Sequence, residues 1–188
     1  YPLEHKERMV KLELCGGALL DLCVYPLNFA SMVFGNDIVG ISAECIKYKT
    51  GVDAQETVML KYADGKMATI YATMLAQSDR RGIINGTNGY IEVENINNPE
   101  SVKVYNLERR VVQEIVAPMQ ITGYEYEVIS AIDAIMEGRV ECPEMPHSET
   151  LFMMKLMDSI REAWGIKFPK EVEALQSESK STDEDETE

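Results

Sequence analysis

The chain has 188 residues, of which 45% are hydrophobic, so it is long enough to bury a sizeable core in one large domain. Its 32 acidic and 18 basic residues give a net charge of −14, which repels the phosphates of nucleic acids and anionic lipid headgroups. Composition and charge therefore argue against nucleic acid and membranes as partners.

The remaining composition points to a cytoplasmic protein. No apolar run approaches the ~20 residues that cross a bilayer, and the polar opening from Tyr1 to Arg8 is unlike a signal peptide. The four cysteines form no CxxC pair, which favours reduced thiols. With only two histidines, His5 and His147, we expect no metal site. The chain starts without methionine, and its opening reads like the middle of a longer protein.

An apolar segment from Ala18 to Phe34 predicts a buried helix. The Gly16-Gly17 pair before it indicates that the backbone approaches another group closely where the helix begins. Pro26 lies inside the segment, so we expect it to kink the helix or divide it in two.

The sequence from Ile38 to Asn106 changes to the alternating pattern of strands. Its clearest hairpin joins a strand ending at Tyr62 to a strand over Lys66–Thr73. Further strands follow at Gly82–Asn85, Tyr90–Glu94, Ser101–Tyr105 and Arg110–Val116. The pattern predicts an open, mostly antiparallel sheet of about six strands.

Two amphipathic helices are predicted after the strands. The first, Tyr124–Glu137, ends at a Gly138 cap and has an apolar stripe that we expect to lie in the core: Val128, Ile129, Ile132, Ile135 and Met136. The second follows Pro146, with Ser148 as its expected N-cap, and ends at Gly165. Its expected core stripe consists of Met153, Leu156, Met157, Ile160 and Trp164.

The order of helix, strands and helices predicts the α+β class, with the helices on one face of the sheet. Residues 176–188 are almost entirely Ser, Thr, Asp and Glu, too polar to bury, and predict a disordered acidic tail. Residues 1–175 are then expected to form one domain.

Asp21 and Tyr25 are the first candidates for chemistry. They stand four residues apart, so both face the same way on a continuing helix. A carboxylate beside a phenol can serve acid–base catalysis. The same spacing also suits a helix in which Asp21 complements the dipole and Tyr25 packs. The residues by themselves leave both interpretations open.

The pair Arg80-Arg81 is a second candidate. Arginine can hold an anionic substrate through charge-assisted hydrogen bonds. Paired arginines in a strand-rich region also mark a solvated sheet edge. Both interpretations remain open for Arg80.

The stretch from Gly16 to Pro26, Gly-Gly-Ala-Leu-Leu-Asp-x-x-x-Tyr-Pro, resembles the opening of the C-terminal domain of Gfo/Idh/MocA (glucose-fructose oxidoreductase and inositol dehydrogenase) oxidoreductases. Three later stretches resemble the same family in the same order, especially its dihydrodiol dehydrogenase-like branch: Gly86–Ile91, Gly123–Glu127 and His147–Leu151. The resemblance implies an open, mostly antiparallel sheet beside an N-terminal Rossmann domain that binds NAD(P). The glycine-rich turn and the Glu-Lys-Pro motif of that Rossmann half have no counterpart here.

The resemblance also implies roles for individual residues. Tyr25 takes the place of the residue that exchanges a proton with the substrate hydroxyl or carbonyl, and Asp21 that of its orienting partner. We further assign Gly17 and Arg80 to substrate binding, and no residue to cofactor or metal binding.

The expected function is that of a substrate-binding and oligomerisation domain in an NAD(P)-dependent oxidoreductase. Its substrate would carry a CH–OH group, as in a small polyol, sugar or dihydrodiol. NAD or NADP is expected in the full-length protein, whereas the isolated chain should be inactive. The alternative is a non-catalytic binding or oligomerisation domain that has lost, or never had, the dinucleotide-binding half. We expect a homodimer formed through the sheet face.

Overall fold

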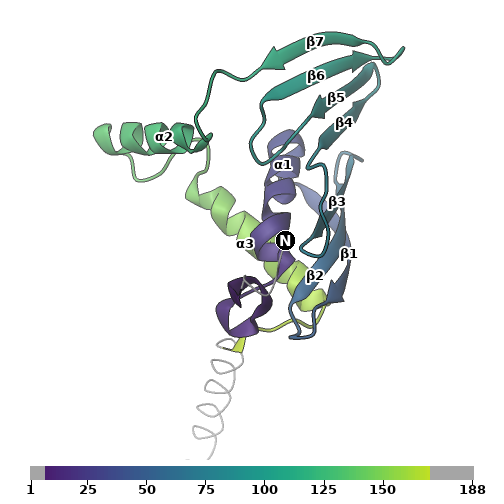
Figure 1. Cartoon of the computed structure of the whole chain (residues 1–188), viewed down its shortest axis with the longest axis vertical. Coiled ribbons are helices and arrows are strands. Elements are labelled where there is room, and N and C mark those ends of the chain that lie inside the picture. The colour runs from purple at the N-terminus through teal and green to yellow at the C-terminus, as the bar shows by residue number, and fades with distance from the viewer. Residues whose placement is uncertain (1–6, 170–188) are drawn as a thin grey trace, which may run out of the picture. The chain divides into compact units, whose positions relative to one another are not determined.

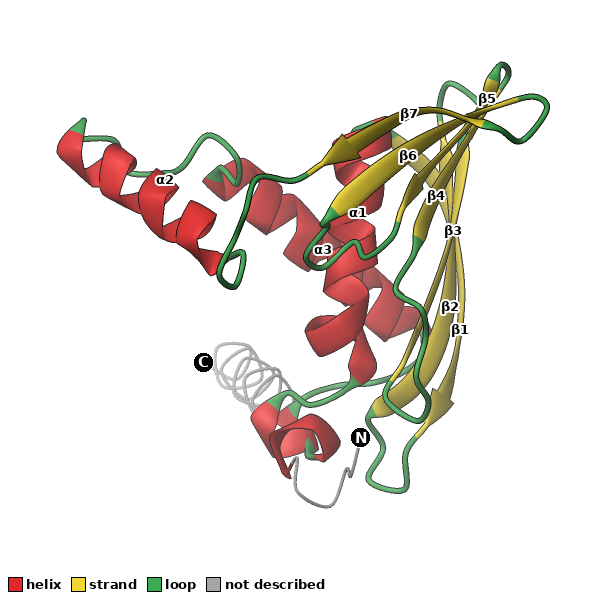
Figure 2. Cartoon of the chain, turned by 45° about the horizontal axis from the view of Figure 1, so that its top comes forward, coloured by secondary structure: helices red, strands yellow, loops and turns green. Residues whose placement is uncertain are grey.

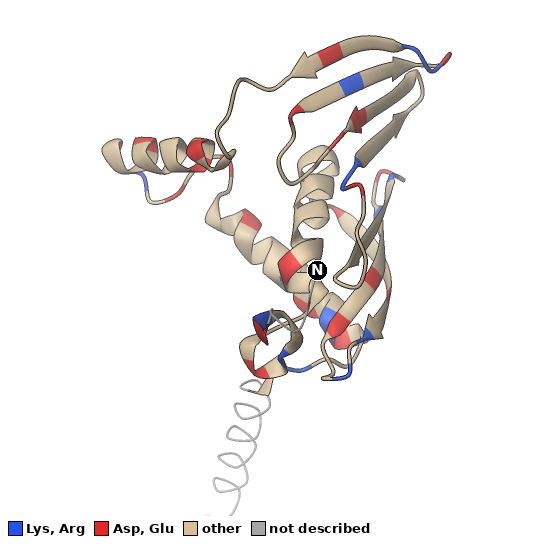
Figure 3. Cartoon of the chain, in the orientation of Figure 1, with Lys and Arg blue, Asp and Glu red and all other residues tan. Residues whose placement is uncertain are grey.

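The computed structural model describes residues 7–169, which form two compact units (Figure 1). Unit 1 consists of residues 7–77 and 155–169, and unit 2 of residues 78–154. The predicted acidic tail, 176–188, lies outside the described residues. In Figure 3 the basic and the acidic residues are both spread over the described part of the chain.

The predicted N-terminal helix is present in unit 1. After two short 3₁₀ turns, a π-helical turn over Leu19–Cys23 leads directly into α1 (Val24–Phe34). Pro26 lies in the first turn of α1, and the helix continues past it to Phe34. A proline ring clashes with the carbonyl four residues back, and the residue at that position, Leu22, lies in the π turn. The helix is therefore not divided at Pro26, and it changes from the π to the α type between Cys23 and Val24.

The helical segment Leu12–Phe34 spans 23 residues and is long and apolar enough to cross a membrane. We did not expect a segment of this length and composition. A core helix of a soluble protein meets the same criteria, and five side chains of this segment are buried inside the chain: Ala18, Leu19, Cys23, Leu27 and Ala30.

Unit 1 contains an antiparallel sheet of three strands in the order β1 (Ile38–Lys47), β2 (Asp53–Tyr62) and β3 (Met67–Thr73). Val58 of β2 pairs with Ala43 on one side and with Ile70 on the other. The hairpin between β2 and β3 is the predicted one. β1 was not among the six predicted strands, because its small and polar residues do not alternate regularly.

One face of this sheet is buried and the other is open. The alternation of β2 buries Val58, Leu60 and Tyr62, while the intervening side chains are exposed. The π-helical turn and α1 both contact β3 (Figure 2), and the Phe34 ring of α1 meets the Tyr62 ring edge-on at 5.4 Å. The helix thus lies on the inner face of the sheet. The opposite face, which we call the outer face, presents Met59, Met67, Thr69 and Tyr71.

α3 (His147–Ala163) begins in unit 2 and ends in unit 1. The Trp164 indole N–H donates to the Ala43 carbonyl of β1 at 3.1 Å, and Lys47 donates to the Trp164 carbonyl at 2.8 Å. Gly165 follows with a φ of 65°, which confirms the predicted end of the helix. The predicted core stripe is confirmed for the four side chains that are buried: Met153, Leu156, Met157 and Ile160.

The start of α3 differs from the prediction. The helix begins at His147, one residue before the expected cap, Ser148. The Glu141 carboxylate accepts the His147 N–H at 2.7 Å and so satisfies a free donor of the first turn. A side chain from the preceding loop therefore does the capping.

Unit 2 contains a four-stranded antiparallel sheet in sequence order: β4 (Gly82–Gly86), β5 (Gly89–Val93), β6 (Ser101–Asn106) and β7 (Val111–Val116). Gly89 has a φ of 145°, and a Cβ there would overlap the Tyr105 backbone, so the β4–β5 turn requires glycine. The α+β class is confirmed. Its strands form two antiparallel sheets of three and four, rather than one sheet of about six.

α2 (Tyr124–Met136) follows the strands of unit 2, and Gly138 has the left-handed φ of 70° expected of a C-terminal cap. The prediction that its apolar stripe lies in the core is wrong. Its five members are between 52% and 81% exposed: Val128, Ile129, Ile132, Ile135 and Met136. Helical periodicity identifies an apolar face but not what covers it. Of the α2 side chains, only Ala134 is buried in the described chain.

Candidate active site

The helix that carries both candidate catalytic residues begins against a carboxylate from β2. Asp53, the first residue of β2, is only 2% exposed. Its Oδ2 accepts the Leu19 N–H at 2.5 Å, and the Ala18 N–H also donates to its carboxylate. Gly17 has a φ of 129°, and a Cβ on it would overlap this carboxylate. The close approach predicted at the glycine pair is therefore present, and the Asp53 side chain is the group approached.

Gly16 allows a second close approach, between the start of the helix and the backbone of Arg8 and Met9. A Cβ on Gly16 would lie 2.5 Å from the Arg8 carbonyl oxygen and 2.7 Å from that of Met9. The Gly17 N–H donates to the Met9 carbonyl at 2.9 Å. The glycine pair thus allows the first 3₁₀ turn, Glu7–Val10, to pack directly against the start of the helix.

This packing gives Asp21 a partner that the sequence did not reveal. The Arg8 guanidinium forms an ion pair with the Asp21 carboxylate. Tyr25, in the first turn of α1, is 46% exposed. Within residues 7–169 no hydrogen bond joins Asp21 to Tyr25. The structure therefore places the carboxylate and the phenol on one helix, with the carboxylate held by Arg8.

The residue between them, Cys23, points into the core of unit 1. It is fully buried and lies beside Glu56 of β2, which is 1% exposed. Burial, followed by the charges of Glu56 and Asp53, raises the pKa of the Cys23 thiol well above its usual value. Cys23 is therefore a neutral, inert core thiol at physiological pH.

Glu56 is the most unusual titratable group of the inner face. Its two carboxyl oxygens have no nitrogen or oxygen partner among the described residues. Burial and the neighbouring Asp53 carboxylate raise the pKa of Glu56 to about 9, so its carboxyl group is protonated at neutral pH. The Glu56 side chain points to the same face of β2 as the buried Val58 and Leu60. The alternation of residues in the sequence already indicates this.

Burial also raises the pKa of Asp53, but several groups oppose the shift. The N–H groups of Leu19 and Ala18 favour the ionised carboxylate, and so does the positive charge of Arg161. Arg161 of α3 is 4% exposed and donates to Asp158 and to the Ile166 carbonyl, both at 2.9 Å. Asp53 thus has several partners suited to an anion, whereas only the Cys23 thiol favours the ionised form of Glu56.

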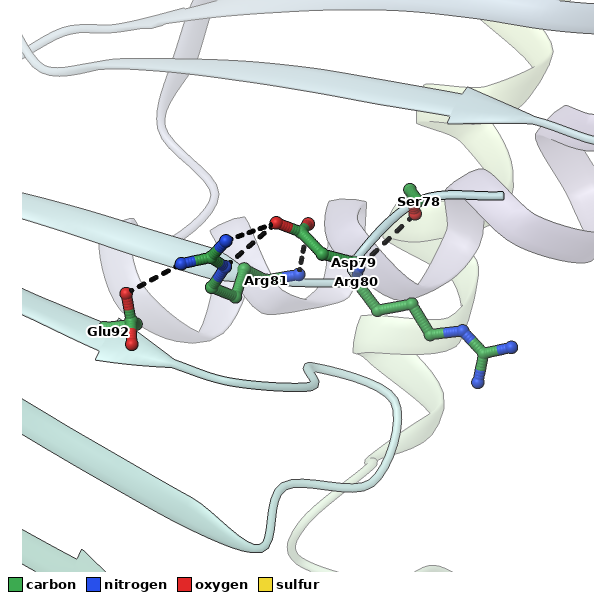
Figure 4. Close-up of polar contacts among 5 residues, drawn as sticks. All are labelled: Ser78, Asp79, Arg80, Arg81 and Glu92. Atoms are coloured by element: carbon green, nitrogen blue, oxygen red, sulfur yellow. Dashed lines mark hydrogen bonds and ion pairs between the residues drawn. The ribbon is translucent and has the colours of Figure 1, made fainter. Parts of the chain in front are cut away.

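Arg80 and Arg81 of unit 2 differ in their contacts (Figure 4). Arg81 donates to Asp79 at 2.9 Å and to Glu92 of β5 at 3.2 Å. The Arg80 side chain points away from these residues in Figure 4, and within residues 7–169 its guanidinium has no ion-pair partner. Arg80 has a left-handed φ of 58°. Arg81 is therefore part of a sheet-edge ion pair, and Arg80 keeps an exposed charge.

No three described His, Cys, Asp or Glu side chains are grouped so that they could hold a metal ion. The described residues also lack a cradle for a dinucleotide. The turn Gly86–Gly89 joins two strands, whereas a dinucleotide cradle needs a strand-to-helix turn. The N–H groups after Gly17 are already occupied by Asp53.

Comparison with known protein families identifies a related domain. The model of the GFO/IDH/MocA C-terminal domain matches residues 1–92. Over these residues, just under half of the chain, the sequence is similar to the C-terminal domain of this oxidoreductase family.

The curated relatives include dihydrodiol dehydrogenases. Trans-1,2-dihydrobenzene-1,2-diol dehydrogenase of Xenopus tropicalis is 30% identical over 168 residues, covering 86% of this chain and 51% of that protein. The Homo sapiens enzyme is 28% identical over 175 residues, covering 90% of this chain and 52% of that protein. The chain thus spans about half the length of the curated relatives it matches.

A solved structure with the same fold is a 3-ketoreductase from Actinomadura kijaniata in complex with NADP and TDP-benzene. Its TM-score is 0.71 at 20% identity, and the match covers 86% of this chain and 50% of that one. At this level of identity the likeness shows the fold alone.

Proposed function

We propose that this chain supplies the substrate-side half of an NAD(P)-dependent oxidoreductase that acts on the CH–OH group of a small polyol, sugar or dihydrodiol. The observation that carries the proposal is the exposure of the Tyr25 phenol, which is 46%. The helix that carries it is hydrogen-bonded at its start to Asp53 of β2. The dehydrogenases among the relatives support the same class of reaction.

In this proposal the chain contributes the proton transfer. Oxidation of a CH–OH group to a carbonyl requires removal of the hydroxyl proton, while NAD(P) held outside this chain supplies the hydride acceptor. The Tyr25 oxygen accepts that proton, or donates it in the reverse direction. A free phenol has a pKa of about 10, so a cation near the phenol has to favour its ionised form. Asp21, held by Arg8, orients the phenol in this proposal. Arg80, which is exposed, remains a proposed substrate contact, whereas Gly17 is buried against the Asp53 carboxylate.

The proposal is tested by assaying the full-length protein against panels of polyols, sugars and dihydrodiols, with reduction of NAD and NADP as the readout. Turnover of at least one panel is the expected result. Absence of turnover in every panel, with the protein folded, would favour the non-catalytic binding or oligomerisation domain.

The isolated chain should bind NAD and NADP no better than an unrelated protein does. The physical reason is that its described residues offer no free helix N-terminus behind a glycine-rich turn for a pyrophosphate. Isothermal titration calorimetry of the chain with each dinucleotide provides the measurement. Saturable binding in the micromolar range would contradict the prediction.

We also propose that two copies associate through the outer face of the three-stranded sheet. The side chains of β3 alternate between the two faces of the sheet. Ile70 and Ala72 are buried on the inner face, whereas Thr69 is exposed and Tyr71 is 51% exposed on the outer face. The apolar and small side chains of this face, flanked by the charged Lys61 and Glu44, suit a self-complementary twofold contact.

Tyr71→Glu should therefore convert the dimer to a monomer, because it places two charges in an apolar contact. Light scattering at several concentrations provides the mass. Leu107→Glu is the matched control, since it adds the same charge at an exposed apolar residue outside this sheet. A wild-type protein that stays monomeric at high concentration would contradict the dimer.

A further inference from the structure

The helix that carries Tyr25 has no N-terminal capping side chain of its own. Its N-cap residue is Ala18, which has no side-chain oxygen, and the first N–H groups of a helix need an acceptor. Asp53 supplies the acceptor from a position 34 residues away, at the beginning of β2. The position of the helix start is therefore set by the sheet rather than by the local sequence.

The contact between Asp53 and the helix is specific to this pair of segments. Gly17 leaves room for the carboxylate because it lacks a Cβ. Asp53 is almost fully buried, and Arg161 adds a favourable positive charge. Buried, charge-assisted hydrogen bonds to backbone N–H groups are short and directional, so they fix the helix along and around its axis.

We infer that Asp53 is a positioning residue for the proton transfer at Tyr25. The inference rests on the function proposed above. Tyr25 lies six residues after Leu19 on one continuous helix, so a shift at the capped end moves the phenol as well. A misplacement of about 1 Å in a catalytic group can cost about a hundredfold in rate. Asp53 makes no contact with substrate in this role and acts only through the helix.

The test combines two changes at Asp53 with Tyr25→Phe in the full-length protein. Asp53→Ala removes both hydrogen bonds, and we expect kcat to fall by about ten- to a hundredfold with little change in KM, because no substrate contact is lost. Asp53→Asn keeps one acceptor oxygen and should restore most of kcat. In the Tyr25→Phe background, Asp53→Ala should cause no further loss.

The last comparison separates positioning from stability. A merely structural role would lower activity by the same factor in both backgrounds, and this result would overturn the inference. So would an Asp53→Ala protein with wild-type kcat. If Asp53→Ala fails to fold, Asp53→Asn in the two backgrounds decides: a loss of about threefold with Tyr25 present and none in Tyr25→Phe supports the inference, and equal effects reject it. A Tyr25→Phe protein with full activity would instead refute the proposed function.

Discussion

Tyr25→Phe should lower turnover of the full-length protein by about a hundredfold or more, the usual scale of general acid–base catalysis. The change removes the hydroxyl that exchanges the proton and keeps the aromatic ring. Within the described chain the Tyr25 hydroxyl has no hydrogen-bond partner, and the side chain is half exposed. The melting temperature should therefore stay close to that of the wild type.

Asp21→Asn should give a smaller loss, because the role proposed for the carboxylate is to orient the phenol and not to exchange the proton. The double variant should cost less than the sum of the two separate effects, since the two residues act as one unit. If Asp21 only complements the helix dipole and binds Arg8, Asp21→Asn instead lowers stability and leaves turnover unchanged. Turnover and melting temperature of the four proteins decide between these outcomes, and full activity of Tyr25→Phe would end the catalytic interpretation.

The stability of unit 1 should fall steeply as the pH rises from about 5 to about 9. Burial and the Asp53 charge raise the pKa of Glu56 from 4.5 to about 9, so the folded chain holds a proton that the unfolded chain releases. The unfolded state then binds fewer protons than the folded state, and stability decreases with pH throughout this window. A pKa change of this size corresponds to a loss of several kcal/mol once the window has been crossed.

Glu56→Gln should remove most of this pH dependence, because glutamine has the same shape and does not titrate. Its melting temperature should equal that of the wild type near pH 5 and exceed it by several degrees at pH 8 to 9. Calorimetric melting across the pH range provides the measurement. Glu44→Gln is the control, since Glu44 is an exposed carboxylate on β1 and its removal should leave the slope unchanged. A Glu56→Gln protein with the wild-type slope would show that Glu56 is not the titrating group.

Local patterns in the sequence were sufficient to predict much of the fold. The helix after Gly17, the hairpin between β2 and β3, and the buried stripe of α3 all follow from short-range periodicity or turn chemistry. The strand β1 has no regular alternation. The apolar stripe of α2 is predicted correctly as a stripe but wrongly as core. Helical periodicity does not say what covers an apolar face.

The candidate site was only half visible in the sequence. Asp21 and Tyr25 could be found because they belong to one short motif. Their supporting residues come from other segments: Arg8 from the preceding turn, and Asp53 from a strand 34 residues beyond Leu19. Such partners depend on chain packing, which no local spacing encodes. Glu56 is different, because the alternation of β2 in the sequence is enough to predict that its side chain points to the buried face.

The contact between Trp164 and β1 makes the two units distinguishable by fluorescence. Trp164 is the only tryptophan of the chain, and its half-buried indole donates to the Ala43 carbonyl at 3.1 Å. Its emission therefore reports the loss of packing between the end of α3 and β1, and unit 2 contributes no indole signal. Eight of the nine tyrosines lie in the described residues, four of them in unit 1 and four in unit 2. Denaturation followed by the indole and by circular dichroism would then show whether the two units unfold together or in sequence.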